Sequence, residues 1–271
     1  MHFLMKNKPL VARKKVVLIG GLGVIGKILQ KGFSDAYELV VLDLAEPKAK
    51  SIRNYVKTDV TNIDQLITAI PDDAYALINL TGLPNHAPIP DAKGFRLYSD
   101  LYLVGAYNIL LAAAAKNIRK IVFASTNHVT GAYEIEGKSS LGRRITVDDY
   151  PLPDSAYGAM KLCGELLGYL FSRQNNISVI CLRIGTVVED EISFLKSNAR
   201  AHRTIMNKHD TIEIFKRALE TKLSYGVYYA VSDNPGSPWD ISNAINELGI
   251  QPGLHAQDFL REENELGRKN A

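Results

Sequence analysis

The feature that most constrains the fold is a glycine-rich turn placed directly after a short apolar run. The run at 15–19 is followed by Gly20-Gly-Leu-Gly-Val-Ile-Gly26 and then by a helix-compatible stretch that extends to residue 32. The three spaced glycines permit a tight turn, close approach of the backbone to a pyrophosphate, and close helix–strand packing. The start of the helix would present free N–H groups to an anion. The pattern predicts a strand–turn–helix unit that binds a dinucleotide through Gly20, Gly23, Val24, Ile25 and Gly26.

Apolar, β-branched runs alternate with helix-compatible stretches over the first two-thirds of the chain. The predicted strands are 15–19, 39–42, 54–56, 74–80, 120–124 and 178–182, and the predicted helices are 24–32, 63–70, 94–116 and 155–172. Such alternation implies crossover connections, and hence a mostly parallel sheet with helices on both faces. The runs are continuously apolar, as is typical of parallel strands buried on both faces. We therefore expect an α/β fold, a Rossmann-type doubly wound parallel sheet.

The regular alternation ends near Gly185, and this sets the expected domain organisation. We interpret residues 1–14 as a basic, solvated N-terminal tail and 15–185 as the dinucleotide-binding Rossmann domain. Residues 186–271 are interpreted as a small C-terminal substrate cap interleaved with the Rossmann core. Within this last part the sequence predicts a helix at 211–220, a strand at 226–231 and a loop at 233–238.

Composition argues against several other classes of protein. The chain of 271 residues is 46% hydrophobic and 23% charged, which fits a globular protein, and its net charge of +3 gives no reason to expect a nucleic-acid-binding surface. No signal peptide and no membrane-spanning segment are expected. The two cysteines, Cys163 and Cys181, have no metal-ligand spacing, so no metal site is predicted. We expect both to be buried core residues and the protein to be cytoplasmic.

A carboxylate ends the second predicted strand. Asp43 lies about 20 residues after the glycine turn, where such a group can hydrogen-bond both ribose hydroxyls of the adenosine. It would also repel a 2′-phosphate, so NAD is favoured over NADP; the alternative is a solvated strand end. The dipeptide Asp59-Val60 lies where the adenine ring would rest. The carboxylate could accept from the exocyclic amine while Val60 packs on the ring, although 58–62 could equally form a helix cap.

A phenol and an ammonium group follow the fifth predicted strand. Tyr157 and Lys161 are four residues apart in the predicted helix 155–172, so both side chains lie on one face. A cation beside a phenol favours the phenolate and lowers its pKa, which suits a general base. The turn at 125–128 contains Ser125 and Thr126, and a hydroxyl there could share a substrate hydroxyl with Tyr157. Asp154 and Ser155 are suitable cap residues for the start of this helix.

Together these motifs resemble the extended short-chain dehydrogenase/reductase superfamily, which comprises the NAD-dependent epimerases and dehydratases. The resemblance covers residues 15–185 and rests on Gly20-x-x-Gly23-x-x-Gly26, Asp43, Asp59-Val60, Thr126 and Tyr157-x-x-x-Lys161, in that order. Three further segments, 123–133, 154–161 and Leu182-Arg-Ile-Gly185, look most like those of the uronate dehydrogenases.

The resemblance implies NAD-dependent oxidation of a hexuronic acid, of glucuronate or galacturonate type, at C1 to an aldarolactone. Tyr157 would take the proton of the C1 hydroxyl, which Thr126 would orient. Lys161 would hold the nicotinamide ribose and lower the pKa of Tyr157. The implied NAD-binding residues also include Leu80, Thr81 and Gly82, and the implied substrate-binding residues are Asn127, His128, Arg183 and Asn85. Arg183 would pair with the uronate carboxylate, because a guanidinium fork suits a planar carboxylate.

Each implied sugar contact has a structural alternative. His128 could be a satisfied structural histidine, Asn127 could stabilise its own turn, and Arg183 could pair with an acidic residue of the cap. The chain also departs from the family pattern. Tyr102 stands where the superfamily usually has asparagine, and Pro84 stands where uronate dehydrogenases tend to offer serine, for which Asn85 could compensate. The 133–149 loop is also long and would reshape the mouth of the pocket. The exact sugar and its epimer therefore stay open.

Two other functions also stay open. A nucleotide-sugar epimerase or dehydratase would need a larger C-terminal domain than the 86 residues (271 − 185) that follow Gly185. A non-enzymatic NAD-binding sensor would typically lack the Tyr157–Lys161 pair. The two long predicted helices, 94–116 and 155–172, commonly pair between subunits in this superfamily. A homo-oligomer that acts on a small sugar acid, with no nucleic-acid or membrane partner, is therefore the expected state.

Overall fold

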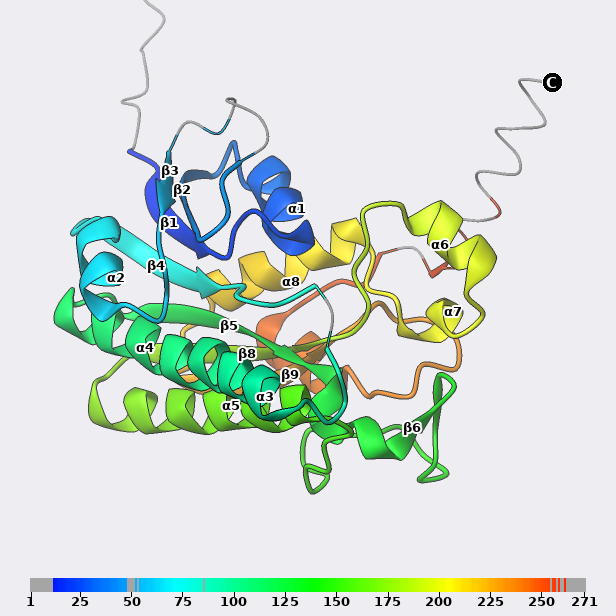
Figure 1. The fold of residues 1–271 in the computed structure, drawn as a ribbon. Coiled ribbons are helices and arrows are strands. Elements are labelled where there is room, and N and C mark those ends of the chain that lie inside the picture. Colours follow the sequence, from blue (N-terminus) through cyan, green and yellow to red (C-terminus); the bar gives the residue numbers. More distant parts are fainter. Residues whose placement is uncertain are drawn as a thin grey trace, which may run out of the picture.

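The computed structural model describes residues 12–47, 52, 54–84, 86–253, 255, 256, 258 and 261. Its centre is a seven-stranded sheet (Figure 1) with the strand order β3-β2-β1-β4-β5-β8-β9. The strands are β1 (Lys14–Ile19), β2 (Tyr37–Asp43), β3 (Tyr55–Lys57), β4 (Ala74–Asn79), β5 (Lys120–Thr126), β8 (Ser178–Ile184) and β9 (Tyr225–Ala230). Every neighbouring pair is parallel. The predicted Rossmann-type sheet is thereby confirmed.

Helices cover both faces of this sheet (Figure 1). The helices α1 (Val24–Gly32) and α8 (Lys208–Glu220) lie on one face, and α2 (Ile63–Ala69), α4 (Gly105–Ala115) and α5 (Ala156–Gln174) lie on the other. Successive side chains of a strand point to opposite faces, so the sheet builds two cores. In β1, Leu18 packs in the core that contains Phe215 of α8, whereas Ile19 packs in the core that contains Ile109 of α4.

A long helical run replaces the single helix predicted at 94–116. It consists of α3 (Ala92–Ser99), a π-helical turn, η1 (Asp100–Val104), and α4. By length and composition the run Ala92–Ala115 could cross a membrane. The expectation that no segment approaches the length of a membrane span is therefore wrong. The finding is weak evidence for a membrane, because the inner side of α4 packs against the sheet and a core helix passes the same test.

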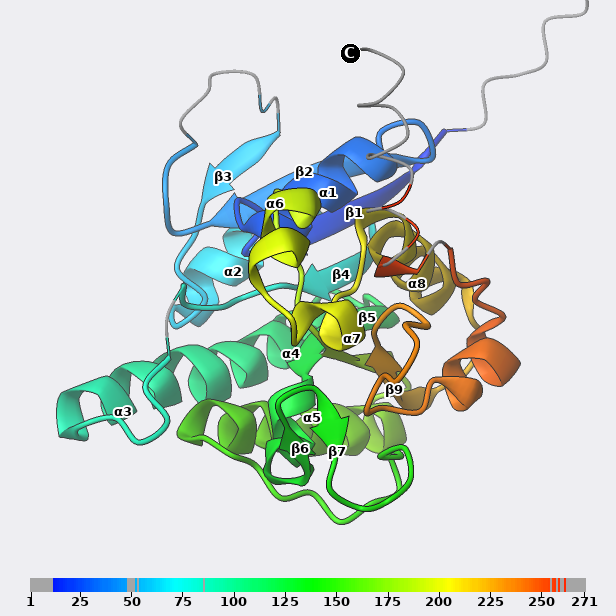
Figure 2. The same cartoon turned by 90° about the vertical axis from the view of Figure 1, so that its right-hand side faces the viewer.

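The segments that follow the strands gather at the carboxyl edge of the sheet (Figure 2). They include the 3₁₀ helix η2 (Asn127–Tyr133), the hairpin of β6 (Glu134–Ile135) and β7 (Lys138–Ser139), and the short helices α6 (Glu191–Ser197) and α7 (Ala201–Thr204). A last π-helical turn, η3 (Ala244–Leu248), lies beside β9 and α8. Because β9 and α8 belong to the main sheet and its helical layer, the chain after residue 185 serves both the core and its edge. The domain boundary at 185 stays a prediction.

The two cysteines differ in burial. Cys181 is buried in β8, but Cys163 is exposed on α5. The buried side of α5 is formed by residues spaced three and four apart, such as Met160, Gly164 and Gly168, and position 163 points away from it. The expectation that both cysteines are buried is therefore wrong for Cys163.

Candidate active site

A cleft of about 430 Å³ opens at the carboxyl edge of the sheet. The strand order reverses between β1 and β4, and open α/β sheets bind their ligands at such a point. The volume lies in the range of small-molecule sites. The structure brings together most of the predicted site residues in the lining of this cleft: Gly20, Gly23, Val24, Ile25, Gly26, Leu80, Thr81, Gly82, Thr126, Asn127, His128, Tyr157 and Lys161.

The glycine turn forms a cradle that side chains would fill. Gly20 has a φ of +77°, and a Cβ there would lie 2.9 Å from the backbone of Leu80. A Cβ on Gly26 would lie 2.1 Å from the carbonyl oxygen of Gly21. The helix α1 begins at Val24, and its N-cap residue Gly23 has no side chain to cap it, so the first N–H groups of the helix are not taken by a capping side chain. The cradle thus fits the diphosphate of a dinucleotide.

Asp43 is held beside this turn. The N–H of Leu22 donates to its Oδ2 at 2.9 Å, and the N–H of Ala45 donates to its Oδ1 at 3.0 Å. The carboxylate at the end of β2 is thus bound next to the glycine turn rather than free in solvent. This position is compatible with the ribose contact, which stays a prediction.

Asp59 and Val60 do not line the cleft. Oδ1 of Asp59 accepts from the N–H of Thr61 at 2.9 Å and from its hydroxyl at 2.8 Å. Val60 is buried, and its carbonyl accepts from the side chain of Asn108. Both residues therefore stabilise the turn before α2, the alternative that the sequence left open, and their contact with adenine stays a prediction.

Tyr157 and Lys161 reach the cleft from one side of α5. The helix begins after Ser155, whose hydroxyl accepts from the N–H of Gly158 at 3.2 Å, as the sequence predicted for this cap. Nζ of Lys161 donates to the carbonyls of Thr81 at 3.0 Å and Ala124 at 2.9 Å. The ammonium group thus joins the ends of β4 and β5, at 5.9 Å from the centre of the Tyr157 ring.

Burial controls the pKa of both groups. It raises the pKa of Tyr157 to about 12, while a hydrogen bond with Thr126 acts in the opposite direction. It lowers the pKa of Lys161 to about 7. The sequence predicted a lowered phenol pKa, and the structure has the reverse. Burial penalises the phenolate, and the buried lysine, only partly charged near neutral pH, offsets only part of this penalty. The predicted closeness of Thr126 and Tyr157 is present.

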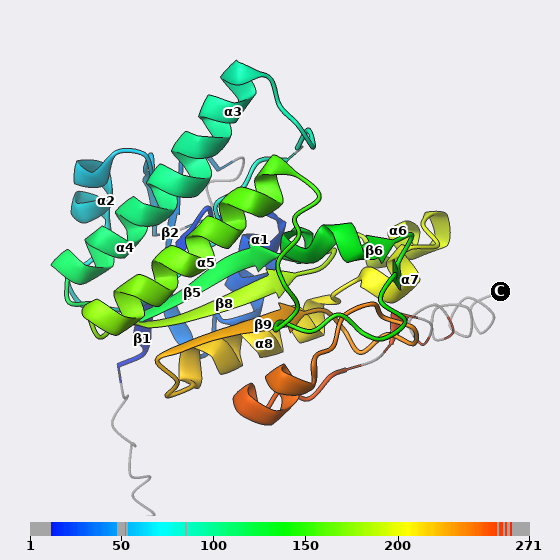
Figure 3. The same cartoon turned by 90° about the horizontal axis from the view of Figure 1, so that it is seen from below.

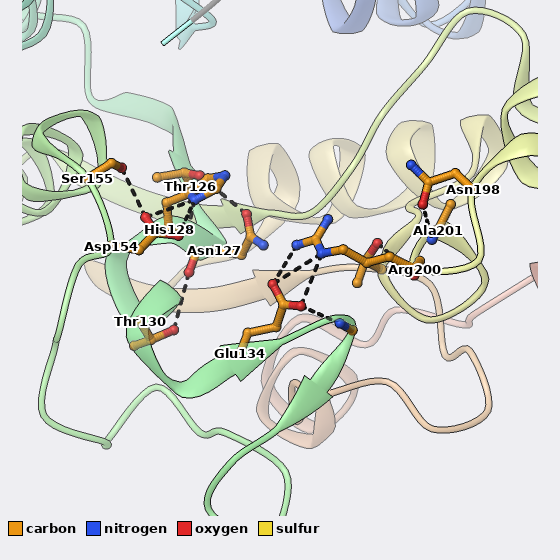
Figure 4. A network of polar contacts seen from close by, with 12 residues as sticks. Thr126, Asn127, His128, Thr130, Glu134, Asp154, Ser155, Asn198, Arg200 and Ala201 are labelled. Atoms are coloured by element: carbon orange, nitrogen blue, oxygen red, sulfur yellow. Dashed lines mark hydrogen bonds and ion pairs between the residues drawn. The ribbon is translucent and has the colours of Figure 1, made fainter. Parts of the chain in front are cut away.

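The turn after β5 holds Thr126, Asn127 and His128 at the cleft (Figure 4). The hydroxyl of Thr126 accepts from the N–H of His128 at 3.2 Å. Nδ1 of His128 lies 2.8 Å from Oδ2 of Asp154, so this carboxylate orients the imidazole and does not cap α5. His128 therefore has an acidic hydrogen-bond partner, as expected of a structural histidine, and it also lines the cleft.

Arg183 does not line the cleft. Its side chain is buried, and Glu165 of α5 accepts from its Nε at 3.0 Å and from its Nη2 at 2.9 Å. A contact with a substrate carboxylate would require this buried pair to break. The placement contradicts the expected role and matches the alternative of an acidic partner, although that partner comes from α5 and not from the cap. Asn85, the other implied sugar contact, lies outside the described residues.

Among the cleft residues that were not predicted from the sequence, two have titratable side chains, Arg200 and His86. Arg200, just before α7, extends toward Asn127 (Figure 4), and its Nη2 lies 2.6 Å from Oε2 of Glu134. His86, in the loop after β4, stacks on Tyr157 with ring centres 4.0 Å apart. Arg200 lies in an aperiodic polar segment, so no pattern marked it. His86 carried one usable signal, its place shortly after a predicted strand that ends at the cleft.

Comparison with known proteins agrees with this geometry. Residues 16–221 match the sequence model of the NAD dependent epimerase/dehydratase family. The chain is 44% identical to the uncharacterized protein YtbQ of Bacillus subtilis, over 92% of this chain and 98% of that protein. It is 27% identical to the NAD-dependent glucose-6-phosphate dehydrogenase of Haloferax volcanii, over 91% of this chain and 96% of that protein.

A solved structure of glucuronic acid dehydrogenase from Chromohalobacter salexigens has the same fold. The TM-score is 0.77 at 26% sequence identity, and the match covers 93% of this chain and 89% of that chain. The extent of the family match, together with the glycine cradle and the Tyr157–Lys161 pair, leads to one conclusion. The chain belongs to the NAD dependent epimerase/dehydratase family, and its cofactor is NAD.

Proposed function

We propose that this chain is an NAD-dependent sugar dehydrogenase that oxidises the C1 hydroxyl of a hexuronic acid, such as glucuronate or galacturonate, to an aldarolactone. The observation that carries the proposal is that one cleft is lined by the glycine cradle together with Thr126, Tyr157 and Lys161. NAD bound in the cradle supplies the acceptor for the hydride that leaves C1. The proton of the same hydroxyl passes to Tyr157, so the two-electron oxidation balances.

Tyr157 serves as the general base in this proposal. Its pKa is raised by burial, so it needs a positive charge nearby to ionise near neutral pH. Lys161 supplies this charge through the fraction that is protonated near neutral pH, and two carbonyl oxygens hold its Nζ on the side of the cleft that carries Tyr157. Thr126, hydrogen-bonded to the phenol, orients the reacting hydroxyl. Asn127 and His128 bind other hydroxyls of the sugar.

Arg200 is the residue that we propose for the acidic group of the sugar, in place of Arg183. It lines the cleft, and its guanidinium extends toward Asn127 and Glu134 (Figure 4). Two relatives are named for glucose derivatives with an acidic group, glucuronic acid and glucose 6-phosphate. A guanidinium at the sugar end of the cleft suits either group. A sugar phosphate is therefore the second candidate substrate, favoured by the match to the Haloferax enzyme.

The subunit arrangement is part of the same proposal. Helices α4 and α5 lie side by side (Figure 3), and their outer sides expose apolar residues. These residues are Tyr107, Leu111, Leu166, Tyr169 and Leu170. Several exposed apolar residues on two adjacent helices are compatible with an interface. We therefore propose a homo-oligomer formed through α4 and α5, which light scattering coupled to size-exclusion chromatography would test.

The first experiment is to measure NADH formation from NAD with D-glucuronate, D-galacturonate and glucose 6-phosphate, with glucose and galactose as neutral controls. A kcat/KM that is far higher for the uronates than for the neutral sugars supports the proposal, and one that is highest for the phosphate selects the second candidate. Equal rates on the neutral sugars would contradict a role for the acidic group. No NADH with any of them, but interconversion of a nucleotide sugar, would identify an epimerase, because an epimerase recycles its cofactor. The Tyr157→Phe variant is the negative control and should bind NAD without turnover.

A further inference from the structure

The imidazole of His86 lies against the phenol of Tyr157. The two ring centres are 4.0 Å apart, and the ring planes are inclined by only 27°. His86 comes from the loop after β4, whereas Tyr157 comes from the first turn of α5. Both residues line the cleft. The loop therefore supplies one wall against the ring that we propose as the general base.

Tyr102 holds His86 in this position. Its hydroxyl oxygen lies 2.5 Å from Nε2 of His86 and accepts from the N–H of Leu83 at 2.9 Å. Because this oxygen already accepts the amide hydrogen, its own proton is best donated to Nε2, which leaves the histidine proton on Nδ1. Burial, followed by the charges of Lys161 and His128, lowers the pKa of His86, in agreement with a neutral imidazole.

Tyr102 is itself in an unusual place. It is buried in the π-helical turn η1, and π-helical turns inside α-helices often occur at functional sites. Its ring packs edge-on against Tyr157, with centres 5.1 Å apart at 62°. Two rings joined by a hydrogen bond thus contact the phenol. Neither residue belongs to the two main cores, and Tyr102 packs instead with Tyr98 and Met160 in a separate small cluster beside Tyr157.

We propose that His86 is a positioning residue for Tyr157 and that the hydroxyl of Tyr102 keeps it in place. The inference rests on the proposed function, in which Tyr157 removes the proton. The paired rings limit rotation of the phenol and keep its oxygen beside Thr126. Loss of the pair therefore lowers the rate of proton removal and leaves the diphosphate cradle, which other residues form, intact.

Tyr98 offers a matched control. Its hydroxyl accepts from the N–H of Ala87 at 2.8 Å, so it ties down the same loop as Tyr102 does. Its ring meets His86 edge-on, with centres 5.8 Å apart. Tyr98→Phe and Tyr102→Phe each remove one hydroxyl that holds this loop. Only the second substitution removes the hydrogen bond to His86.

The kinetic test compares the wild type with Y98F, Y102F, H86F and the double variant H86F/Y102F on the sugar that gives most turnover. We expect kcat to fall about tenfold in Y102F and in H86F, with KM for NAD changed less than about twofold. Because the two residues act as a unit, the double variant should be no slower than either single variant. Y98F should stay within about twofold of the wild type. Equal losses in Y98F and Y102F, or additive losses in the double variant, would overturn the proposal.

The pH profile of kcat separates positioning from loop support. The titratable groups that face His86 are Lys161, His128, Tyr98, Tyr102 and Tyr157. The apparent pKa that the profile reports for Tyr157 should shift in H86F and Y102F, because the surroundings of its ring change. The same apparent pKa should be unchanged in Y98F. A profile that is unchanged in both H86F and Y102F would contradict the positioning role.

A nuclear magnetic resonance measurement keeps this inference distinct from the proposed function. The chain has six histidines, so the imidazole signals can be resolved, and H86F identifies that of His86. Stacking predicts upfield-shifted ring protons for His86, a shift that Y157F keeps and Y157L removes. If no sugar is turned over while this shift is present, the proposed function fails and the positioning role falls with it. If sugars are turned over and the shift is absent, the inference alone fails.

Discussion

Arg183 and Glu165 form a two-point ion pair, with side chains that are 5% and 2% exposed. Oε1 of Glu165 also accepts from the hydroxyl of Ser125 at 2.5 Å, next to Thr126 in β5. Glu165 follows Lys161 by four residues on α5, and Arg183 lies in β8. The pair therefore ties together the elements that carry Thr126, Lys161 and Tyr157.

The first prediction concerns the stability that depends on this pair. Arg183→Met leaves the Glu165 carboxylate buried without its partner, so the free energy of unfolding should fall by about 3–5 kcal/mol. The double variant R183M/E165M should recover part of this loss. Denaturant unfolding measures both. In the folded fraction of R183M, KM for a uronate and KM for a neutral sugar should change by the same factor. A rise confined to the uronate would restore Arg183 as the carboxylate ligand.

Substitution of Arg200, unlike that of Arg183, should change KM for the acidic sugar alone. Arg200→Met removes a charge-assisted contact to the acidic group of the sugar, which is worth about 1.5–3 kcal/mol, so KM for the acidic sugar should rise roughly 10- to 100-fold. KM for a neutral sugar should stay nearly constant. Arg203→Met is the matched control, because this arginine lies three residues on and does not line the cleft. Steady-state kinetics on both sugars decide the matter, and an equal effect of R200M on the two would remove Arg200 from substrate recognition.

Sequence patterns sufficed for the main sheet and its covering helices because local periodicity marked those elements, whereas β6, β7, α6 and α7 were not predicted. Strands such as β5 are continuous apolar runs, and α1 begins directly after a glycine turn that follows a strand, a context that favours a dinucleotide-binding unit over a merely structural turn. The sequence missed the π-helical turn around Tyr102, since neighbouring contacts decide where a helix widens.

The site was predictable only where motif and spacing coincide. Tyr157 and Lys161 share a helix face, so their spacing places both at the cleft. Continuing that spacing by four leads to Glu165, and this signal could have indicated an acidic partner for Arg183. Contacts between segments that are far apart in the sequence produce no comparable sequence pattern. The stacking of His86 on Tyr157 depends on how the loop after β4 folds back, which no local pattern encodes.

Lys161 should make stability depend on pH. Burial lowers its pKa from the ordinary 10.5 to about 7, so between these values the unfolded chain binds more protons than the folded one. The free energy of unfolding therefore rises as pH increases across this window. This gain in stability is lost as pH falls toward 7. Relative to Lys161→Met, the wild type should gain up to about 1.4 kcal/mol per pH unit there. Denaturant unfolding at pH 7, 8, 9 and 10 measures the slope, with the exposed Lys93→Met as control. Parallel curves for wild type and K161M would show that Lys161 is not desolvated.

Asp43 should determine the choice between NAD and NADP. Its carboxylate is fixed beside the glycine turn by the amides of Leu22 and Ala45, where a 2′-phosphate would be repelled. Asp43→Asn removes the charge, so kcat/KM for NAD should fall about tenfold while the preference over NADP narrows. Asp59→Asn is the matched control, because Asp59 is bound to Thr61 and does not line the cleft. We expect D59N to leave both cofactors unaffected. Loss of NAD affinity in D59N as large as in D43N would instead show that Asp59 contacts the adenine ring, and an unchanged preference in D43N would show that other residues exclude the phosphate.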